Sequence, residues 1–332
     1  MQNFEKEIKE QPLILETLII KHIKDDIISE FPSMGKFLRV TFIASGTSKN
    51  AGEFGAYYFE QIAKIPSKVE FASEIISKDV IFDKNDLVIF ISQSGKSADV
   101  VAALEKVKKT KAKTLAVVNV ADSPLGLGAD FKIDMEAGEE LAIPATKSFS
   151  ATVVKLFLLA LDFAAKKGLD IKSYIDEVKN LPFAANEIFN CELSKKLAQN
   201  FDVEIFLGRG LNYFALLEGA LKIKEAALEV VIPFPLGEYV HGHMVTLKPS
   251  THIVAVSYTF DDMYEIDEGL LERVEKNYSP YIILLSEDIF ALRSKYLTPI
   301  LVVILLQIVA SELAKQKGLN PDKPQGLNKV TE

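Results

Sequence analysis

The chain has 332 residues, of which 48% are hydrophobic and 25% are charged, and its formal net charge is −8 at pH 7. It is long enough for two domains of ordinary size, or for one large domain, and it can bury a large core. The acidic balance argues against a nucleic-acid-binding protein, which usually carries a basic face. It does not exclude an anionic substrate, because helix dipoles and a few lysines set the local potential.

The remaining compositional features indicate a soluble protein of a reducing compartment. The single cysteine, Cys191, excludes an internal disulfide, and no zinc-type spacing of Cys and His is present. The N-terminal sequence is charged and lacks the apolar core of a signal peptide. The longest apolar run, at 299–306, is shorter than the about 20 residues that span a bilayer, so we interpret it as part of a buried helix. We therefore expect a cytoplasmic protein with neither a membrane nor a nucleic acid as partner.

The first half of the chain alternates between two periodicities. Helical spacing predicts helices at 5–31, 51–65, 97–109 and 146–168. Short β-rich or continuous apolar runs predict strands at 40–45, 68–72, 87–92, 113–120 and 130–135. Strands that alternate with helices of this length are typical of βαβ units and a parallel sheet, and continuous apolar strands indicate that both sheet faces are covered.

The second half repeats this pattern with an offset of roughly 160 residues. Strands are predicted at 204–210, 251–259 and 281–286, and helices at 211–228, 265–276 and 299–318. We therefore predict two α/β domains of the same topology, joined by a polar helical stretch at about 170–200. The predicted boundaries are 1–170 for the first domain, 171–318 for the second and 319–332 for a C-terminal tail.

Hydroxyl side chains gather where two predicted strands run into helices. The turns SGTSKN and ISQSGKS supply six polar side chains: Thr47, Ser48, Ser92, Gln93, Ser94 and Ser97. In open α/β sheets ligands bind at the carboxyl ends of the strands, where helix N-termini favour phosphate. Neither turn has the spacing of a dinucleotide or P-loop motif, so the expected anion is a single phosphate on a small molecule. The alternative is that these residues are ordinary helix N-caps.

Three charged residues share one face of a predicted helix that is otherwise apolar. Glu218, Lys222 and Glu225 follow the spacing i, i+4, i+7 within LLEGALKIKEAAL. Charges on such a face are either paired ion bridges or functional groups. For Glu218 and Lys222 the residues alone leave both interpretations open.

Several blocks of the sequence, in order, resemble one known family. They are ASGTSKNAGEFGAYYFEQIAKIPSKVEFASE, ISQSGKSADVVAALEKVKKTKAKTLAVVNV, PATKSFSA, FLGRGLNYFALLEGALKIKE, GEYVHG and NPDKPQGLNKVTE. Together they resemble the sugar isomerase (SIS) domain family, and in particular the C-terminal isomerase half of glucosamine-6-phosphate synthase. The resemblance covers nearly the whole chain. It implies an α/β fold of two flavodoxin-like SIS domains, each a three-layer αβα sandwich with a five-stranded parallel sheet.

The resemblance also implies roles for individual residues. The first domain would bind the phosphate of a 6-phosphosugar through the six polar residues of the two turns. Glu225 would be the base that moves a proton between C1 and C2, with Lys222 nearby. His241 would open the sugar ring and would reach the site from the other subunit of a homodimer. Lys329 would contact the open-chain sugar near its carbonyl, where an imine has been proposed. Neither a metal nor an organic cofactor is implied.

The predicted function is that of an amino-sugar phosphate isomerase/deaminase, which interconverts glucosamine 6-phosphate with fructose 6-phosphate and free ammonia. Two alternatives stay open: a deglycase or aldose–ketose isomerase acting on another 6-phosphosugar, and a non-catalytic phosphosugar sensor. The family's full-length synthase begins with a glutamine-hydrolysing domain whose nucleophile is an N-terminal cysteine. Because residue 2 is Gln, we expect this chain not to make ammonia from glutamine by itself.

Four positions depart from the family pattern. The family has serine, lysine, proline and arginine where this chain has Ala145, Val240, His243 and Gln325. These departures leave the identity of the sugar and the direction of the reaction open. We assign no role to His243.

Overall fold

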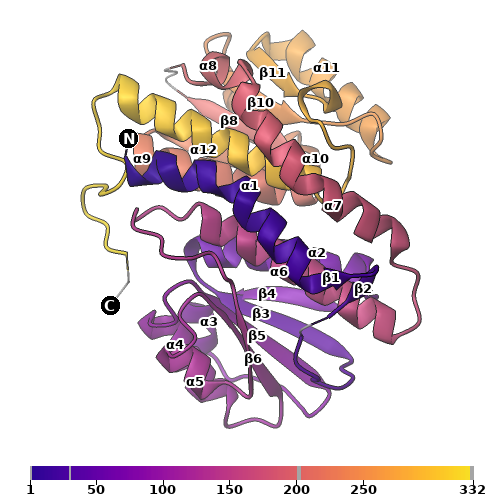
Figure 1. Ribbon diagram of the computed structural model, residues 1–332. Helices are drawn as coiled ribbons and strands as arrows, with labels where there is room; N and C mark the ends of the chain where they lie inside the picture. Colours follow the sequence, from indigo (N-terminus) through magenta and orange to yellow (C-terminus); the bar gives the residue numbers. More distant parts are fainter. Residues whose placement is uncertain (1, 30, 200–202, 330–332) are drawn as a thin grey trace. The chain divides into compact units, whose positions relative to one another are not determined.

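The computed structural model describes residues 2–29, 31–199 and 203–329, which fall into two compact α/β units (Figure 1). The N-terminal unit consists of Leu13–Glu140, Lys147–Lys179 and Asn328–Glu332. The C-terminal unit consists of Met1–Pro12, Leu141–Thr146 and Asn180–Leu327. Each unit is described by itself. The domain boundaries predicted at 170 and 318 stay a prediction.

The N-terminal unit is built on a five-stranded parallel sheet with the strand order β4-β3-β5-β6-β7 among the described residues. Its strands are β3 (Arg39–Ala44), β4 (Ser67–Phe71), β5 (Asp86–Ser92), β6 (Lys113–Val118) and β7 (Phe131–Asp134). Every residue of β5 is buried, because this central strand is covered on both faces. All five strands lie at the places where the alternating sequence pattern predicts them.

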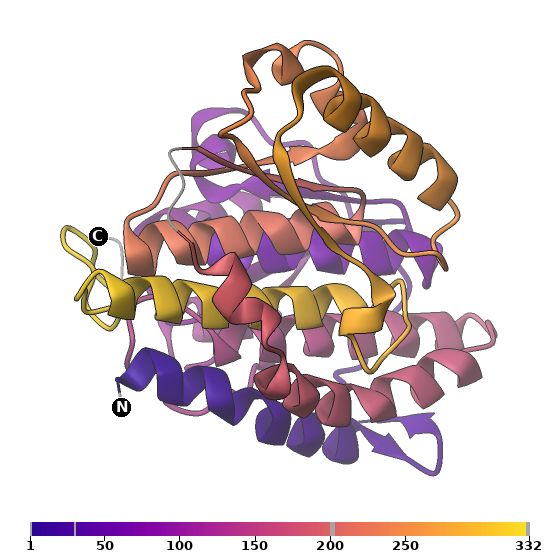
Figure 2. The ribbon, with the colours of Figure 1, turned by 90° about the horizontal axis from the view of Figure 1, so that it is seen from above.

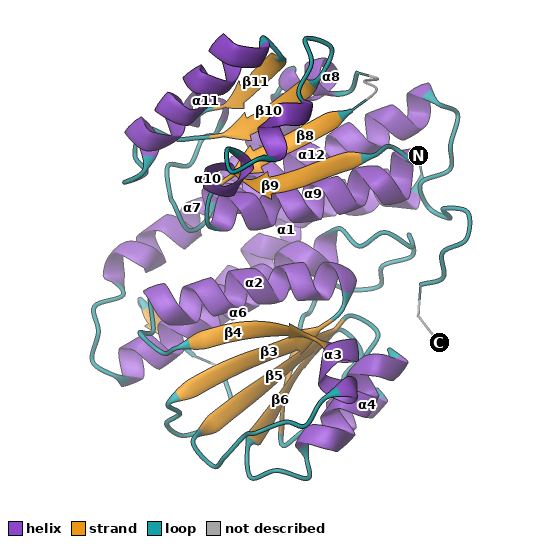
Figure 3. Ribbon diagram, turned by 180° about the vertical axis from the view of Figure 1, so that it is seen from behind, coloured by secondary structure: helices purple, strands orange, loops and turns teal. Residues whose placement is uncertain are grey.

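Helices cover both faces of this sheet (Figure 3). One face carries α2 (Gly46–Gln61) and α6 (Lys147–Lys166), and the other carries α3 (Ala72–Ser77), α4 (Ala98–Val107) and α5 (Pro124–Gly128). Val88 and Phe90 of β5 pack with Val100 and Leu104 of α4 in one apolar cluster. The predicted αβα sandwich with a parallel sheet is therefore confirmed for this unit.

The first helix, α1 (Asn3–His22), is shorter than the sequence pattern predicts. The predicted helix over 5–31 is wrong beyond residue 22, where β1 (Ile23–Lys24) pairs antiparallel with β2 (Ile27–Ile28). The two residues between them, Asp25 and Asp26, have φ values of 51° and 60°. Two consecutive residues of positive φ form the turn that suits a two-residue hairpin, and aspartate tolerates this conformation. Residue 30 of the predicted helix lies outside the described residues.

The C-terminal unit has a parallel sheet with the order β11-β10-β8-β9. Its strands are β8 (Glu204–Gly208), β9 (Val231–Pro235), β10 (His252–Val256) and β11 (Tyr281–Leu285). On one face α9 (Leu211–Ala227) and α12 (Thr298–Gln316) lie side by side, as Figures 1 and 2 both show. On the other face lie α10 (Leu236–Tyr239) and α11 (Tyr264–Tyr278). The polar stretch before β8 forms α7 (Lys172–Glu187) and α8 (Leu193–Leu197), as predicted.

This second sheet has four strands within the described part of the chain, so the prediction of five strands is wrong here. The connection from β11 to α12, residues 286–297, holds only the short 3₁₀ turn Glu287–Ile289. In the N-terminal unit the corresponding connection, residues 119–146, is long enough for α5 and β7. The sequence pattern also missed β9, which contains Pro233 and Pro235. Proline has no backbone N–H, and β9 accommodates two because it lies at the edge of its sheet.

Two helices among the described residues, α6 and α12, are long and apolar enough to cross a membrane by length and composition. Their most apolar windows are 94% and 83% buried inside the structure, which is typical of core helices. The apolar run at 299–306 thus belongs to a longer buried helix. This helix approaches α9 closely at Gly219, where an added Cβ would lie 2.2 Å from the Cδ1 atom of Leu306.

A buried histidine and a buried lysine meet in the N-terminal unit. The His22 ring places Nδ1 2.8 Å from the carbonyl oxygen of Ser29 and Nε2 2.7 Å from Nζ of Lys155. A carbonyl can only accept and an ammonium can only donate, so His22 is neutral and carries its proton on Nδ1. Burial lowers the pKa of His22, and the nearby charge of Lys155 lowers it further.

We predict that the protein loses stability as the pH falls below the ordinary histidine pKa near 6.5. Because the folded-state pKa of His22 is lowered, the unfolded state binds more protons in this window, and the free energy of unfolding decreases with decreasing pH. Urea unfolding between pH 8 and pH 5 measures the effect. The His22→Gln variant should show a shallower slope of stability against pH than the wild type. Equal slopes for wild type and His22→Gln would contradict the assignment.

Candidate active site

The two hydroxyl-rich turns lie at the carboxyl ends of neighbouring strands in the N-terminal sheet. β3 and β5 are hydrogen-bonded neighbours in parallel, so their carboxyl ends are adjacent. α2 begins directly after β3 and carries Thr47 and Ser48 in its first turn. Ser92 is the last residue of β5, and the loop that follows leads to Ser97 at the start of α4. The fold therefore brings together the turns that hold all six predicted phosphate-binding residues.

Hydrogen bonds within the second turn fix its shape. The Ser92 hydroxyl accepts the N–H of Gly95 at 3.1 Å and lies 3.3 Å from the Ser97 hydroxyl. The Ser94 hydroxyl accepts the N–H of Lys96 at 3.2 Å. The loop is thus a tight, hydroxyl-lined turn in front of a helix.

The N-termini of α2 and α4 argue against the interpretation that these residues are ordinary helix N-caps. Ser97 is the N-cap residue of α4 and Ser45 that of α2, and neither side chain makes a capping hydrogen bond. The first-turn N–H groups of the two helices are therefore not occupied by these hydroxyls. The expectation that the six residues bind phosphate stays a prediction, in which an anion would use the remaining first-turn N–H groups and the helix dipoles.

Sequence reasoning missed the residue that joins the two turns. Asp99, in the first turn of α4, accepts the hydroxyl of Ser45 on one carboxylate oxygen. Its other oxygen accepts the N–H of Val100 at 2.8 Å. This carboxylate links the end of β3 to the start of α4 and so holds the two turns side by side. A lone aspartate in a helix first turn gives no sequence signal of such a long-range partner.

Gly95 is required by the conformation of the loop. It has a φ of +63°, and an added Cβ would lie 1.9 Å from the hydroxyl oxygen of Ser123. The carbonyl oxygen of Gly95 accepts the N–H of Leu125 at 3.1 Å. The loop is thereby packed against the next βα connection of the sheet, and a side chain at residue 95 cannot be accommodated.

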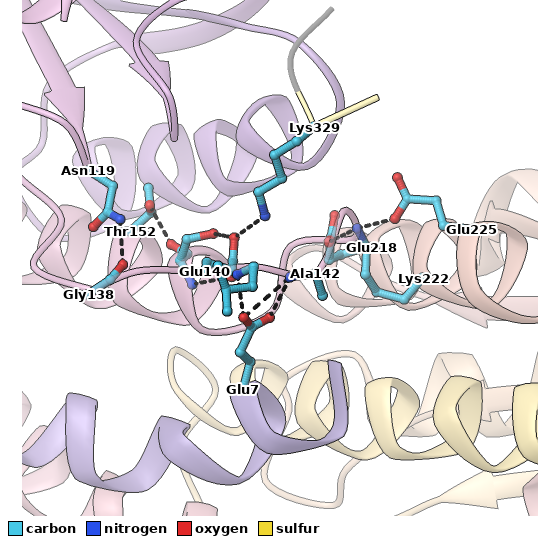
Figure 4. Close-up of polar contacts among 12 residues, drawn as sticks. Glu7, Asn119, Gly138, Glu140, Ala142, Thr152, Glu218, Lys222, Glu225 and Lys329 are labelled. Carbon is cyan, nitrogen blue, oxygen red and sulfur yellow. Dashed lines mark hydrogen bonds and ion pairs between the residues drawn. The ribbon is translucent and has the colours of Figure 1, made fainter. Parts of the chain in front are cut away.

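In the C-terminal unit, α9 presents the predicted charged face (Figure 4). Nζ of Lys222 lies 3.4 Å from a carboxylate oxygen of Glu218 and donates a hydrogen bond to Glu225. The side chains of Glu218 and Lys222 are fully buried, whereas that of Glu225 is 19% exposed. Burial alone would lower the pKa of Lys222, but the two carboxylates outweigh it and raise this pKa, so the lysine is an ammonium.

This arrangement separates the roles of the two glutamates. Glu218 is a buried counter-ion for Lys222, which supports the ion-bridge interpretation for that pair. Glu225 belongs to the same bridge but keeps an exposed edge, so it is the carboxylate that a ligand can reach. One ammonium shared by two carboxylates leaves a local negative charge, which suits a proton acceptor.

His241 lies on an exposed turn directly after α10. Its backbone N–H donates to the carbonyl oxygen of Glu238 at 2.9 Å, and its ring makes no described hydrogen bond. His243 is different, because its ring packs against Phe234 with 4.4 Å between the ring centroids. The two histidines thus differ in their surroundings. Of the two, His241 is the one whose ring can contact a ligand.

Lys329 in the tail has a partner that the sequence analysis did not identify. Its ammonium donates to a carboxylate oxygen of Glu140 at 3.0 Å within the N-terminal unit (Figure 4). Earlier in the tail, Asp322 accepts the N–H groups of Asn3 and Phe4 at 2.9 and 2.7 Å within the C-terminal unit. These bonds cap the N-terminus of α1 from the far end of the chain.

Among the described residues no group of three or more His, Cys, Asp or Glu side chains is suited to a metal ion.

Comparison with known families finds a likeness for the first unit. The sequence model of the SIS domain family matches residues 36–162. This part of the chain is therefore similar to a SIS domain, which agrees with its parallel sheet.

Similar proteins extend the likeness to the whole chain. Glutamine–fructose-6-phosphate aminotransferases (isomerizing) from Caldanaerobacter subterraneus subsp. tengcongensis and Halalkalibacterium halodurans are 32% and 34% identical to it. Each alignment covers 98% of this chain, but the chain spans only 58% and 57% of those relatives.

Two solved structures share the fold over nearly their full length. The C-terminal domain of glucosamine-fructose-6-phosphate aminotransferase from Francisella tularensis is 29% identical, with a TM-score of 0.88 and 98% of both chains covered. Glucosamine-6-phosphate deaminase from Thermotoga maritima is 25% identical, with a TM-score of 0.80 and 99% of both chains covered. The predicted α/β SIS fold is thereby confirmed.

We predict that Gly95→Ala destabilises the N-terminal unit and weakens its binding of phosphate. The left-handed backbone and the clash with Ser123 together should lower the free energy of unfolding by about 1–3 kcal/mol. Thermal unfolding with and without added phosphate measures both effects. Gly269→Ala is the matched control, because an added Cβ at residue 269 meets nothing within 4 Å. A Gly95→Ala protein with wild-type stability and an unchanged response to phosphate would contradict the prediction.

Proposed function

We propose that the protein is a phosphosugar isomerase that interconverts glucosamine 6-phosphate with fructose 6-phosphate and free ammonia. The observation that carries this proposal is the pair of helix starts, α2 and α4, which are lined by hydroxyls and whose N-cap serines make no capping hydrogen bond, in the region that matches the SIS domain family. The aminotransferase and deaminase names of the similar proteins support an amino-sugar phosphate as substrate.

The phosphate would be bound by Thr47, Ser48, Ser92, Gln93, Ser94 and Ser97 together with the N–H groups of both helix starts. This binding energy comes from a part of the substrate that does not react, and it orients the carbon end of the sugar. In the proposed homodimer His241 of one subunit serves the site of the other, where it moves the ring-oxygen proton to open the sugar. The protein would act in the cytoplasm without a cofactor.

The proton transfer needs one base that serves two adjacent carbons. In the direction of amination, ammonia adds to the C2 carbonyl of the open ketose and water leaves, which gives an imine at C2. Glu225 then takes a proton from C1 and returns it to C2, while the proton of the C1 hydroxyl passes to the nitrogen, and the product has an aldehyde at C1 and an amine on C2. The reverse sequence releases ammonia. Lys222 holds Glu225 in place by its hydrogen bond, and Lys329 donates a hydrogen bond near the sugar carbonyl.

Other phosphosugars fit the same chemistry, because a base that moves a proton between C1 and C2 does not depend on the substituent on C2. A deglycase or an aldose–ketose isomerase is therefore the alternative enzyme. A sensor without catalysis would need the phosphate-binding turns but not the charged face of α9. The reachable, lysine-paired Glu225 favours an enzyme over a sensor.

We predict that Glu225→Gln lowers kcat for glucosamine 6-phosphate by about 10²–10⁴-fold, the usual contribution of a general base. KM should change little, because phosphate binding is left intact. Release of ammonia and fructose 6-phosphate measures both parameters. Glu229→Gln removes a carboxylate just beyond the same helix and should retain full activity.

Two other outcomes would decide against the proposal. Turnover of Glu225→Gln at the wild-type rate would reject this residue as the base. Tight binding of 6-phosphosugars without turnover of any of them by the wild-type protein would favour the sensor.

A further inference from the structure

Glu140 is a fully buried carboxylate with a complete set of donors. It lies in the loop between β7 and α6, and its side chain has no exposed surface. The N–H and the hydroxyl of Ser148, in the first turn of α6, donate to it at 3.1 and 2.8 Å. Lys329 supplies the ammonium at 3.0 Å. A buried carboxylate is costly unless it is paired, and the N-terminus of a long helix favours negative charge, so this site is built to receive a cation.

The loop that carries Glu140 is tied to the phosphate-binding turn. The N–H of Asn119 donates to the carbonyl oxygen of Gln93 at 3.1 Å. The Asn119 side chain donates to the carbonyl oxygen of Gly138 at 2.7 Å and accepts the N–H of Ala137 at 3.0 Å. Figure 4 shows the bond from Asn119 to Gly138, which lies two residues before Glu140. Asn119 therefore connects the turn containing Ser92 and Ser94 to the residues just before Glu140. All of these contacts lie within the N-terminal unit.

We propose that Glu140 is a positioning residue that fixes the ammonium of Lys329 at a set place relative to the phosphate-binding turns. This inference rests on the proposed function, in which Lys329 acts at the sugar carbonyl. A lysine has a flexible side chain of four methylene groups, and here it belongs to the last part of the chain. The buried carboxylate orients the ammonium of this side chain. The distance from the phosphate to the ammonium of Lys329 is then set by the carboxyl end of the sheet, the turn after β5 and the loop between β7 and α6.

The test is a double-mutant cycle with Glu140→Gln and Lys329→Ala. If Glu140 acts through Lys329, Glu140→Gln should lower kcat by roughly 10- to 100-fold, because small misplacements of a reacting group have effects of that size. KM should change far less. In the Lys329→Ala background the same substitution should have almost no further effect. Glu139→Gln, a change at the exposed neighbouring glutamate, is the matched control and should behave as wild type.

A second measurement does not depend on activity. Hydrogen exchange of the peptide covering 324–329 should be slow in the wild type and in Glu139→Gln, and faster in Glu140→Gln. The isosteric glutamine keeps an acceptor for Ser148, and circular dichroism confirms that the variant is folded. If no phosphosugar is turned over but the exchange pattern holds, the proposed function fails while the docking of the tail stands. The inference itself is overturned by unchanged exchange in Glu140→Gln, or by an equal loss of kcat with and without Lys329.

Discussion

The proposed site depends on two helix starts, at the carboxyl end of a parallel sheet, whose N-cap serines make no capping hydrogen bond. A helix N-terminus must satisfy its N–H groups, and in α2 and α4 the flanking serines do not do so. Asp99 and Gly95 hold the two starts together with their hydroxyls around them. In the proposed function, the oxygens of a phosphate accept hydrogen bonds from these N–H groups, and every other proposed role follows from where the carbon end of the sugar would then lie.

The C-terminal unit repeats the topology but not this chemistry. At the end of β8, where the first unit has its hydroxyl turn, the guanidinium of Arg209 is bound to Asp267 by hydrogen bonds of 2.6 and 2.9 Å. After β10, the hydroxyl of Thr259 donates to Glu287. Side chains that are paired with one another thus occupy the strand ends at which the first unit has its hydroxyl-rich turns. The two units of the repeat therefore differ, since one has the hydroxyl-rich turns and the other has the charged face of α9.

Local patterns predicted the elements whose signals are themselves local. The apolar strands, the hydroxyl turns and the i, i+4, i+7 face of α9 follow from neighbouring residues, and the structure contains them all. The hairpin at Asp25 and Asp26 was missed because a helical pattern on both sides outweighed a turn signal of two residues. β9 was missed because its prolines argue against a central strand. Glu140 needs a partner 189 positions away, and no single-sequence pattern carries that information.

The central claim is that the N-terminal unit binds the phosphate of a sugar at the starts of α2 and α4. A crystal structure of the protein with fructose 6-phosphate tests it most directly. The account predicts phosphate oxygens within hydrogen-bond distance of the hydroxyls of Thr47, Ser48, Ser94 and Ser97, and Glu225 within reach of C1 and C2. A sugar bound with its phosphate elsewhere would contradict the account.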